Sequence, residues 1–129
     1  MGASTNPERP SNRCVRTYLD AGWTVWPVHP AGHAVHGAPG FRSLRELPGR
    51  PEIVSMYVNP RDAVALLDDI VAVAPDWLWL NPGADGEPMA SAARARGLHV
   101  VEACNLVGLS LGDPRDLARR HAAGASGGT

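Results

Sequence analysis

Hydrophobic residues along this chain switch between helical and strand-like spacing. From Pro10 to Gly22 they recur every three to four positions, with polar residues on the opposite face, which predicts an amphipathic helix. Short apolar runs without helical spacing predict buried strands at Trp23–Val28, Ile53–Val58, Trp77–Leu80 and Leu98–Glu102. Helical spacing returns between the later runs and predicts helices at Ala63–Ala74 and Glu87–Arg96. Strands and helices therefore alternate along most of the chain.

The connections between these elements are short and rich in turn-forming residues. Ala31–Phe41 is predicted to be a glycine-rich loop, Ser43–Leu47 one helical turn, and Asn59-Pro60 the capped start of a helix. Strands that are apolar throughout are typical of a sheet covered by helices on both faces. Parallel strands with right-handed crossovers fit this order of elements. We therefore predict an α/β fold with a Rossmann-like, doubly wound and mostly parallel sheet.

Length and composition are consistent with one domain. A chain of 129 residues, 44% of them hydrophobic, can bury a single core. We assign residues 1–118 to this domain and expect residues 119–129, which end in small residues, to form a disordered tail. The opening residues lack a charged-then-apolar leader, and no apolar run approaches the ~20 residues of a membrane span. We expect a soluble protein of the cytoplasm.

Charge and residue types argue against several kinds of chemistry. The net charge is −1 and the 12 basic residues are all arginines spread along the chain, which disfavours nucleic acid or an anionic membrane as partner. A Walker-type phosphate loop and a Schiff-base enzyme both need a lysine, and the chain has none. Cys14 and Cys104 fit neither a disulfide framework nor a zinc motif, which suits a reducing compartment.

The predicted strands end in segments suited to anion binding. Ligands of parallel sheets bind at the carboxyl ends of the strands, where helix N-termini present free N–H groups. The segments at these ends are Gly2–Ser4, Pro27–Pro30, Val58–Pro60 and Asn81–Gly83. A Gly-Ala-Ser loop normally follows the first, central strand of such a sheet, yet only Met1 precedes it here. Either the true start lies upstream or the sheet lacks this strand, so we expect the first strand to be truncated and its neighbours to be unpaired.

The first third of the chain resembles a known family. Its motifs are Gly2-Ala3-Ser4, Asn6-Pro7-Glu8-Arg9-Pro10-Ser11 and Pro27-Val28-His29-Pro30. They resemble the small CoA-binding proteins related to the CoA-binding domain of succinyl-CoA synthetase. His29 replaces the asparagine usual in that family, and Val58 replaces a common arginine. Fainter matches follow at Ser43-Leu44, Asn59-Pro60, Trp79-Leu80-Asn81 and Glu102-Ala103-Cys104, so the resemblance covers roughly residues 2–105.

The resemblance implies binding of coenzyme A or acyl-CoA without catalysis. It implies that Gly2–Asn6 and the start of the first helix hold a CoA phosphate, with Arg9 as its charge partner. The residue types agree, because glycine permits close backbone approach, Ser4 and Thr5 carry hydroxyl donors, and arginine offers a planar fork to phosphate oxygens. The expected cofactor-binding residues are Gly2, Ala3, Ser4, Thr5, Asn6, Arg9, Pro10, Ser11, His29, Pro30, Asn59, Pro60 and Asn81.

Two other functions stay open at this point. An NAD(P)-binding oxidoreductase or redox sensor shares the fold, but the chain lacks Gly-x-Gly-x-x-Gly and an acidic residue at the end of the second strand. A detached piece of an acyl-CoA ligase would need a protein partner for catalysis, and the sequence identifies none.

Several remaining residues have an ordinary structural interpretation. His29, His33 and His36 share a loop without a carboxylate or cysteine at ligand spacing, so we expect no metal site. The four tryptophans are expected in the core. No Ser-His-Asp or Cys-His spacing is recognisable, so we expect no catalytic residues. Cys104 ends the last predicted strand, where its thiol could exchange with that of CoA or lie inert.

Overall fold

The chain folds around a short parallel sheet. The computed structural model describes residues 1–110 and 112–127. Its sheet contains β1 (Ile53–Met56), β2 (Trp77–Leu80) and β3 (Val100–Val101), hydrogen-bonded in that order and all parallel. The predicted α/β class with a parallel sheet is confirmed.

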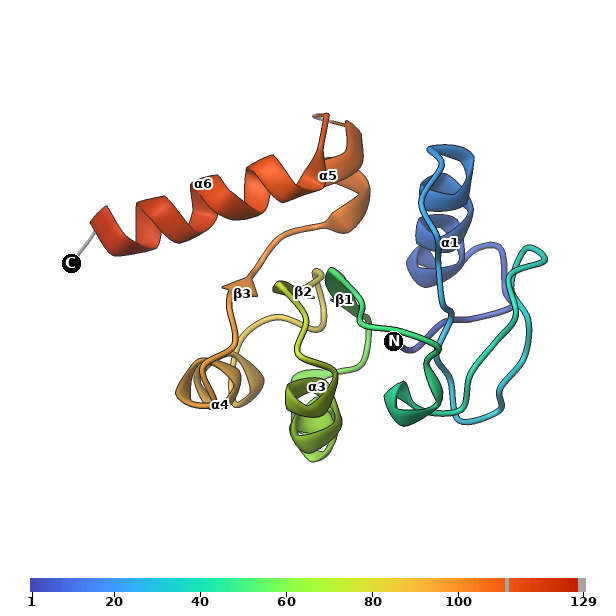
Figure 1. The fold of residues 1–129 in the computed structure, drawn as a ribbon, viewed down its shortest axis with the longest axis horizontal. Helices are drawn as coiled ribbons and strands as arrows, with labels where there is room; N and C mark the ends of the chain where they lie inside the picture. The colour runs from blue at the N-terminus through green and yellow to red at the C-terminus, as the bar shows by residue number, and fades with distance from the viewer. Residues whose placement is uncertain (111, 128–129) are drawn as a thin grey trace.

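Helices cover both faces of the sheet. They are α1 (Pro10–Asp20), α2 (Pro60–Ala63), α3 (Leu67–Val73), α4 (Met89–Ala95), α5 (Asn105–Ser110) and α6 (Pro114–Gly127), with 3₁₀ turns η1 (Leu44–Glu46) and η2 (Val64–Leu66). Helices α3 and α4 lie on one face, and α5 and α6 lie on the other, with α1 beyond the edge formed by β1 (Figure 1). The arrangement is the three-layer sandwich of a doubly wound domain.

The main core lies between the sheet and the α3–α4 layer. Met56 of β1, Leu78 and Leu80 of β2, Ile70 of α3 and Met89 of α4 are completely buried there. Parallel strands covered on both faces need such continuous apolar surfaces, which explains why the sequence shows runs rather than alternation.

The helix predicted at Ala63–Ala74 begins earlier and is broken. Asn59 caps it, because its side-chain oxygen accepts a hydrogen bond from the Asp62 N–H at 3.0 Å. The 3₁₀ turn η2 then separates α2 from α3, and Ala74 ends α3 in the left-handed conformation. The capping role expected for Asn59-Pro60 is confirmed.

Residues Trp23–Val28 do not form a strand of the sheet, which corrects the prediction. Within the described part of the chain, their one β-type pairing is a parallel bridge between Val28 and Phe41. It is made by the Phe41 N–H to Pro27 O and the His29 N–H to Phe41 O, both at 2.9 Å. A strand needs a hydrogen-bonded neighbour along its length, and among the described residues this segment has one only near its end, around Val28.

Residues Met1–Ala3 lie between β1 and the Trp23–Val28 segment. Among the described residues, they alone form backbone hydrogen bonds with both. The Tyr57 N–H donates to Met1 O at 3.0 Å, and the Met1 amino group donates to Ser55 O at 2.6 Å. On the other side, Gly2 and Ala3 donate their N–H groups to Val28 O at 3.0 and 3.2 Å. Met1 therefore pairs with β1 like a residue of a neighbouring strand.

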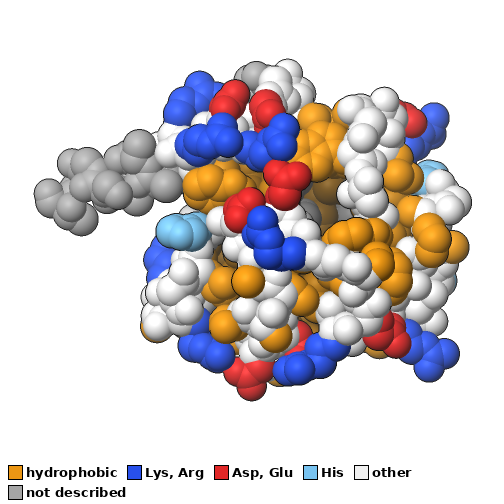
Figure 2. Space-filling view, viewed as in Figure 1, with side chains coloured by type: hydrophobic (Ala, Val, Ile, Leu, Met, Phe, Trp, Pro, Cys, Tyr) orange, Lys and Arg blue, Asp and Glu red, His pale blue; other side chains and the backbone are white. Residues whose placement is uncertain are grey.

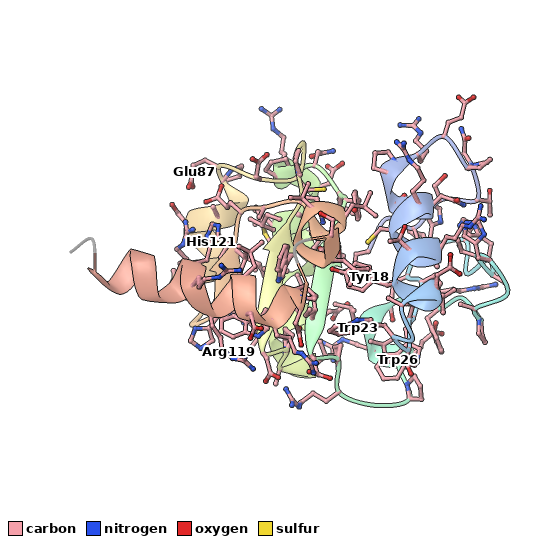
Figure 3. The ribbon with its side chains drawn as sticks, turned by 90° about the horizontal axis from the view of Figure 1, so that it is seen from above. Tyr18, Trp23, Trp26, Glu87, Arg119 and His121 are labelled. Atoms are coloured by element: carbon pink, nitrogen blue, oxygen red, sulfur yellow. The ribbon has the colours of Figure 1, made fainter. Side chains whose placement is uncertain are left out.

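A cavity of about 490 Å³ continues from Met1 between the two halves of the molecule. We call it the strand groove; its long walls are Trp23–Val28 and Pro51–Ser55, and α1 contributes Cys14, Val15 and Tyr18. Tyr18, Trp23 and Trp26 all lie between the sheet and α1 (Figure 3). Figure 2 shows hydrophobic side chains at the surface on the face where these halves meet.

The tryptophans differ in burial, which corrects the expectation that all four belong to the core. Trp79 is completely buried between β3 and α6, whereas Trp77 is half-buried. Trp23 and Trp26 are half-buried in the wall of the strand groove, where Trp23 contacts Tyr18 edge-on. With no strand inside the groove, these two rings have less to pack against.

The carboxyl-terminal part of the chain is more helical than predicted. Helix α6 runs to Gly127, past residue 119, where the sequence predicts the start of a tail; residues 128 and 129 lie outside the described part. Asp113 and Pro114 start the helix, since the Asp113 carboxylate accepts the Arg115 N–H at 2.9 Å. No helix among the described residues has the length and apolar character needed to cross a membrane.

Candidate functional site

The amino-terminal loop, Gly2–Asn6, follows Met1 beside the end of β1 and leads into α1. Gly2 has φ +76°, and a Cβ there would lie 3.2 Å from Val58 Cγ2 and 3.4 Å from the Tyr57 carbonyl carbon. Only glycine combines this backbone angle with such close approach at little cost. The loop therefore rests directly on the backbone at the carboxyl end of β1.

Side chains of the loop fix its own turns. Ser4 Oγ accepts the Asn6 N–H and Asn6 Oδ1 accepts the Glu8 N–H, both at 3.0 Å. The Ser4 hydroxyl hydrogen remains available to another acceptor. Thr5, Asn6 and Arg9 are exposed, and Arg9 has no ion-pair or side-chain hydrogen-bond partner among the described residues.

The loop runs into the N-terminus of α1. Arg9 is the N-cap residue, its side chain does not cap the helix, and Pro10 occupies the first turn. Pro10 has no N–H, and the Asn12 N–H donates to Arg9 O at 3.1 Å. The Ser11 N–H is therefore the first-turn group left for a ligand at the positive end of the helix dipole, although the Ser11 residue is buried.

A buried asparagine holds the loop from behind. Asn12 Nδ2 donates to Ser4 O at 2.8 Å, and Asn12 Oδ1 accepts from His36 Nε2 at 2.6 Å. His33 Nε2 donates to Ala3 O at 2.9 Å, because a carbonyl can only accept. The Ala31–Phe41 loop is thereby fastened to the amino-terminal loop, a connection that the sequence did not reveal.

The three loop histidines do not converge on one point. The rings of His29 and His33 stack with centroids 4.6 Å apart, while His36 turns toward Asn12. Within residues 1–110 and 112–127, no three His, Cys, Asp or Glu side chains gather at metal-ligand distances.

A small pocket of about 300 Å³ opens beside the amino-terminal loop at the strand ends. Its lining comes from four segments of the chain: Met1 and Gly2, then Val28, His29 and Pro30, then Arg42, Ser43 and Leu44, and finally Val58, Asp62, Leu66 and Asp69. Three expected residues, Gly2, His29 and Pro30, thus meet here. Asn59 and Pro60 lie in the segment that carries Val58 and Asp62, but they do not line the pocket.

Asn81 is buried and fully engaged, so the structure does not place it at the ligand surface. Its Nδ2 donates to Ser55 Oγ and Met56 O, each at 2.9 Å, and its Oδ1 accepts the Asn105 N–H at 2.8 Å. Asn105 in turn bonds the Tyr18 hydroxyl. Asn81 therefore ties β1, β2, α5 and α1 together.

The cysteines differ in their surroundings. Cys14 is buried in the wall of the strand groove, and burial raises the pKa of its thiol. Cys104 is half-buried just before α5. Exchange between Cys104 and the CoA thiol stays a prediction.

The geometry defines a class of protein. A glycine-led loop enters a helix N-terminus at the carboxyl ends of parallel strands, and a pocket opens beside it. This is the anion-binding arrangement of Rossmann-like nucleotide-binding domains. The match to the model of the CoA-binding domain family spans residues 1–110, and the chain belongs to that family.

Individual relatives agree with this assignment. The uncharacterized protein YneT of Bacillus subtilis (strain 168) is 23% identical over 101 residues, covering 78% of this chain and 75% of YneT. The structure of cell-free ID.343 from Thermus thermophilus has a TM-score of 0.76 at 28% identity, covering 83% of this chain and 82% of that one. A hypothetical protein from Pyrococcus horikoshii OT3 has a TM-score of 0.72 at 26% identity, covering 79% and 71%.

A larger enzyme shares the fold. The dinucleotide-forming acetyl-coenzyme A synthetase 1 of Ca. Korarchaeum cryptofilum has a TM-score of 0.66 at 16% identity. The match covers 79% of this chain but 24% of that enzyme, and at this identity it concerns the fold alone.

Proposed function

We propose that this protein binds coenzyme A or acyl-CoA, with a phosphate group held by the amino-terminal loop and the N-terminus of α1. The observation that carries the proposal is the placement of Gly2, which brings the loop backbone against the strand end and directs it into the helix. Membership of the CoA-binding domain family supports the choice of ligand.

Arg9 and Ser4 supply the side-chain contacts to the phosphate. Arg9 is exposed at the helix start without a partner among the residues described, so its guanidinium can pair with phosphate oxygens at no loss of an existing ion pair. Ser4 keeps its hydroxyl hydrogen for the same ligand. The Ser11 N–H and the positive end of the α1 dipole add a further attraction for the phosphate.

The protein acts as a binding module and does not itself catalyse reactions of the acyl-CoA thioester. No side chain at the small pocket forms a nucleophile–base pair among the described hydrogen bonds; His29 Nδ1 accepts the Ala31 N–H, and His33 holds Ala3 O. Acetyl-CoA incubated with the protein is expected to be recovered intact by mass spectrometry. Enzyme-dependent hydrolysis or transfer would refute this part.

Calorimetric titration of CoA and NAD into the 129-residue chain tests the proposal. We expect binding of CoA and none of NAD, and Arg9→Ala is expected to weaken CoA binding roughly tenfold because a charge-assisted contact is lost. Arg16→Ala is the control, since Arg16 is an exposed arginine of α1 that pairs with Asp20 on the same helix. A folded protein that binds NAD but not CoA, or binds neither, would refute the proposal.

A further inference from the structure

The small pocket is too small for all of coenzyme A, and its walls suit one end of that molecule. This inference rests on the proposed binding of CoA. A volume of about 300 Å³ is at the lower end of ligand pockets, enough for a nucleoside. Val28, Leu44, Val58 and Leu66 present apolar surface to a flat ring. The adenosine end of CoA, whose ribose carries a 3′-phosphate, has this shape.

Arg42 stands at the same edge of the molecule as His29. Phe41 pairs in parallel with Pro27–His29, so the residue after Phe41 lies beside the end of that segment. The Arg42 N–H donates to Glu46 Oε1 at 2.7 Å, which anchors its backbone at η1. The backbone of Arg42 is therefore held in place beside the small pocket, which its side chain helps to line.

The stem of Arg42 crosses the turn that follows Val28. The Gly32 N–H donates to His29 O at 2.8 Å, and Gly32 has φ +67°. A Cβ on Gly32 would lie 2.8 Å from Arg42 Cγ and 3.3 Å from its Nε. The missing side chain of Gly32 thus makes room for the arginine directly over the His29-Pro30 turn.

The guanidinium of Arg42 is available to a ligand. It makes no hydrogen bond or ion pair among the described residues. Of the two carboxylates that line the pocket, Asp69 pairs with Arg45, whereas Asp62 accepts a hydrogen bond from the uncharged Asn59 Nδ2 at 2.7 Å and keeps its negative charge. Glu46 is occupied by the Arg42 backbone. Arg42 is therefore the cation of this pocket whose charge is not already paired.

In Rossmann-like domains, the ribose of the ligand binds at the end of the second strand, which corresponds to the end of Trp23–Val28 in this chain. A carboxylate there binds free ribose hydroxyls, whereas a nearby arginine accommodates a ribose phosphate. This chain has His29-Pro30 at that place and Arg42 beside it. We infer that the small pocket takes the adenosine of CoA and that Arg42 binds its 3′-phosphate, so that the protein selects CoA over dephospho-CoA.

Calorimetry with CoA and dephospho-CoA tests this selection. Wild type is expected to bind CoA roughly tenfold to a hundredfold more tightly, as charge-assisted contacts to phosphate imply. Arg42→Ala is expected to bind both ligands equally, at the wild-type affinity for dephospho-CoA. Arg42→Lys keeps the charge without the fork and should retain part of the preference. Arg16→Ala, an exposed arginine on α1 away from the pocket, should keep all of it.

The outcomes separate the inference from the proposed function. CoA binding with an undiminished preference in Arg42→Ala, or without any preference in wild type, overturns the role of Arg42 and leaves CoA binding standing. Absence of binding by both ligands to folded wild type overturns the proposed function and this inference with it. Adenosine 3′,5′-bisphosphate and AMP, titrated in the same way, should reproduce the preference, because they carry the adenosine end without pantetheine.

Discussion

At the residue scale, Gly2 combines two requirements that no other residue type meets. Its positive φ turns the chain, and its lack of a Cβ lets the loop approach Val58 and Tyr57. Gly22 also has a positive φ, +91°, but nothing lies within 4 Å of the place of its Cβ. A comparison of substitutions at Gly2 and Gly22 therefore distinguishes the cost of the left-handed backbone from the cost of a steric clash at Cβ.

Gly2→Ala is expected to lower the free energy of unfolding by more than Gly22→Ala, which should cost about 1–2 kcal/mol for the left-handed conformation alone. Gly2→Ala should also weaken CoA binding, because the loop is pushed away from β1. Chemical denaturation and calorimetry on both variants measure the two effects. Equal losses of stability, with unchanged CoA binding, would show that the contact with β1 is unimportant.

Single residues also show which roles a sequence reveals. Asn59 was predictable as a helix cap, because capping is a local property of Asn-Pro before a helix. Asn81, by contrast, stands at a strand end as a ligand contact would, yet its partners Ser55, Met56 and Asn105 are distant in sequence. Arg42 was missed for the same reason, since its place beside His29 depends on the pairing of Phe41.

At the scale of elements, the amino-terminal loop depends on α1 and on the histidine-containing loop. Asn12 connects all three without reaching the ligand surface, since it is buried and bonds Ser4 O and His36. Under the proposed function, Asn12 is a positioning residue for the phosphate-binding loop.

Asn12→Leu is expected to weaken CoA binding severalfold while the protein stays folded, because the Ser4 carbonyl and His36 lose their common partner. The affinity for CoA is measured by calorimetry, and amide hydrogen exchange at Ala3–Asn6 should rise. Arg16→Ala is the control from an exposed position of the same helix. Unchanged exchange in this loop would contradict the positioning role.

Hydrophobic spacing predicted the elements whose partners are near in sequence. Helix α1, turn η1 and strands β1 and β2 lie where the spacing placed them, apart from shifts at their ends. The strand predicted at Trp23–Val28 is not formed, because a strand needs a hydrogen-bonded neighbouring strand and the local sequence pattern does not show whether one is present. Helix α6 was missed, because small residues suggested a tail although Asp113-Pro114 is a good helix start.

At the scale of the whole molecule, the strand groove separates two halves with unpaired edges. Glu52 O accepts the Trp77 N–H and Met56 O accepts the Asn81 N–H, so these carbonyls face β2. The backbone N–H and C=O groups of Ile53 and Ser55 between them therefore point into the groove, where the Met1 amino group bonds Ser55 O. The Tyr57 hydroxyl is buried without a hydrogen-bond partner among the described residues. The groove is therefore shaped and polarised to pair with an extended backbone.

Five apolar, β-branched residues joined ahead of Met1 are expected to fill the groove and raise the melting temperature by at least about 5 °C, through buried apolar area and new backbone pairing. An extension of equal length made of glycine and serine is the control. Thermal unfolding followed by circular dichroism gives the comparison. Equal melting temperatures for the two extended proteins would mean that the groove does not accept a strand.

The buried amino group of Met1 makes stability depend on pH. Burial lowers the pKa of this group to about 6 from its usual 8. Between pH 8 and pH 6 the unfolded chain takes up a proton that the folded chain does not, so the free energy of unfolding should fall by about 2 kcal/mol over that range.

Denaturation at pH 6, 7 and 8 measures this fall, and a chain acetylated at Met1 is the control, since it keeps the histidines and loses the titrating amine. The acetylated chain should show a smaller dependence. The same slope in both would place the pH effect in other groups.

The central claim is that CoA binds at the amino-terminal loop and the small pocket, although the strand groove is the larger cavity. Titration of CoA into ¹⁵N-labelled protein, followed by amide and indole chemical shifts, tests this most directly. The account predicts the largest changes at Gly2–Asn6, Ser11, His29 and Arg42, with little change at the indole groups of Trp23 and Trp26. Changes confined to those two indoles and the walls of the strand groove, or no changes at all, would contradict it.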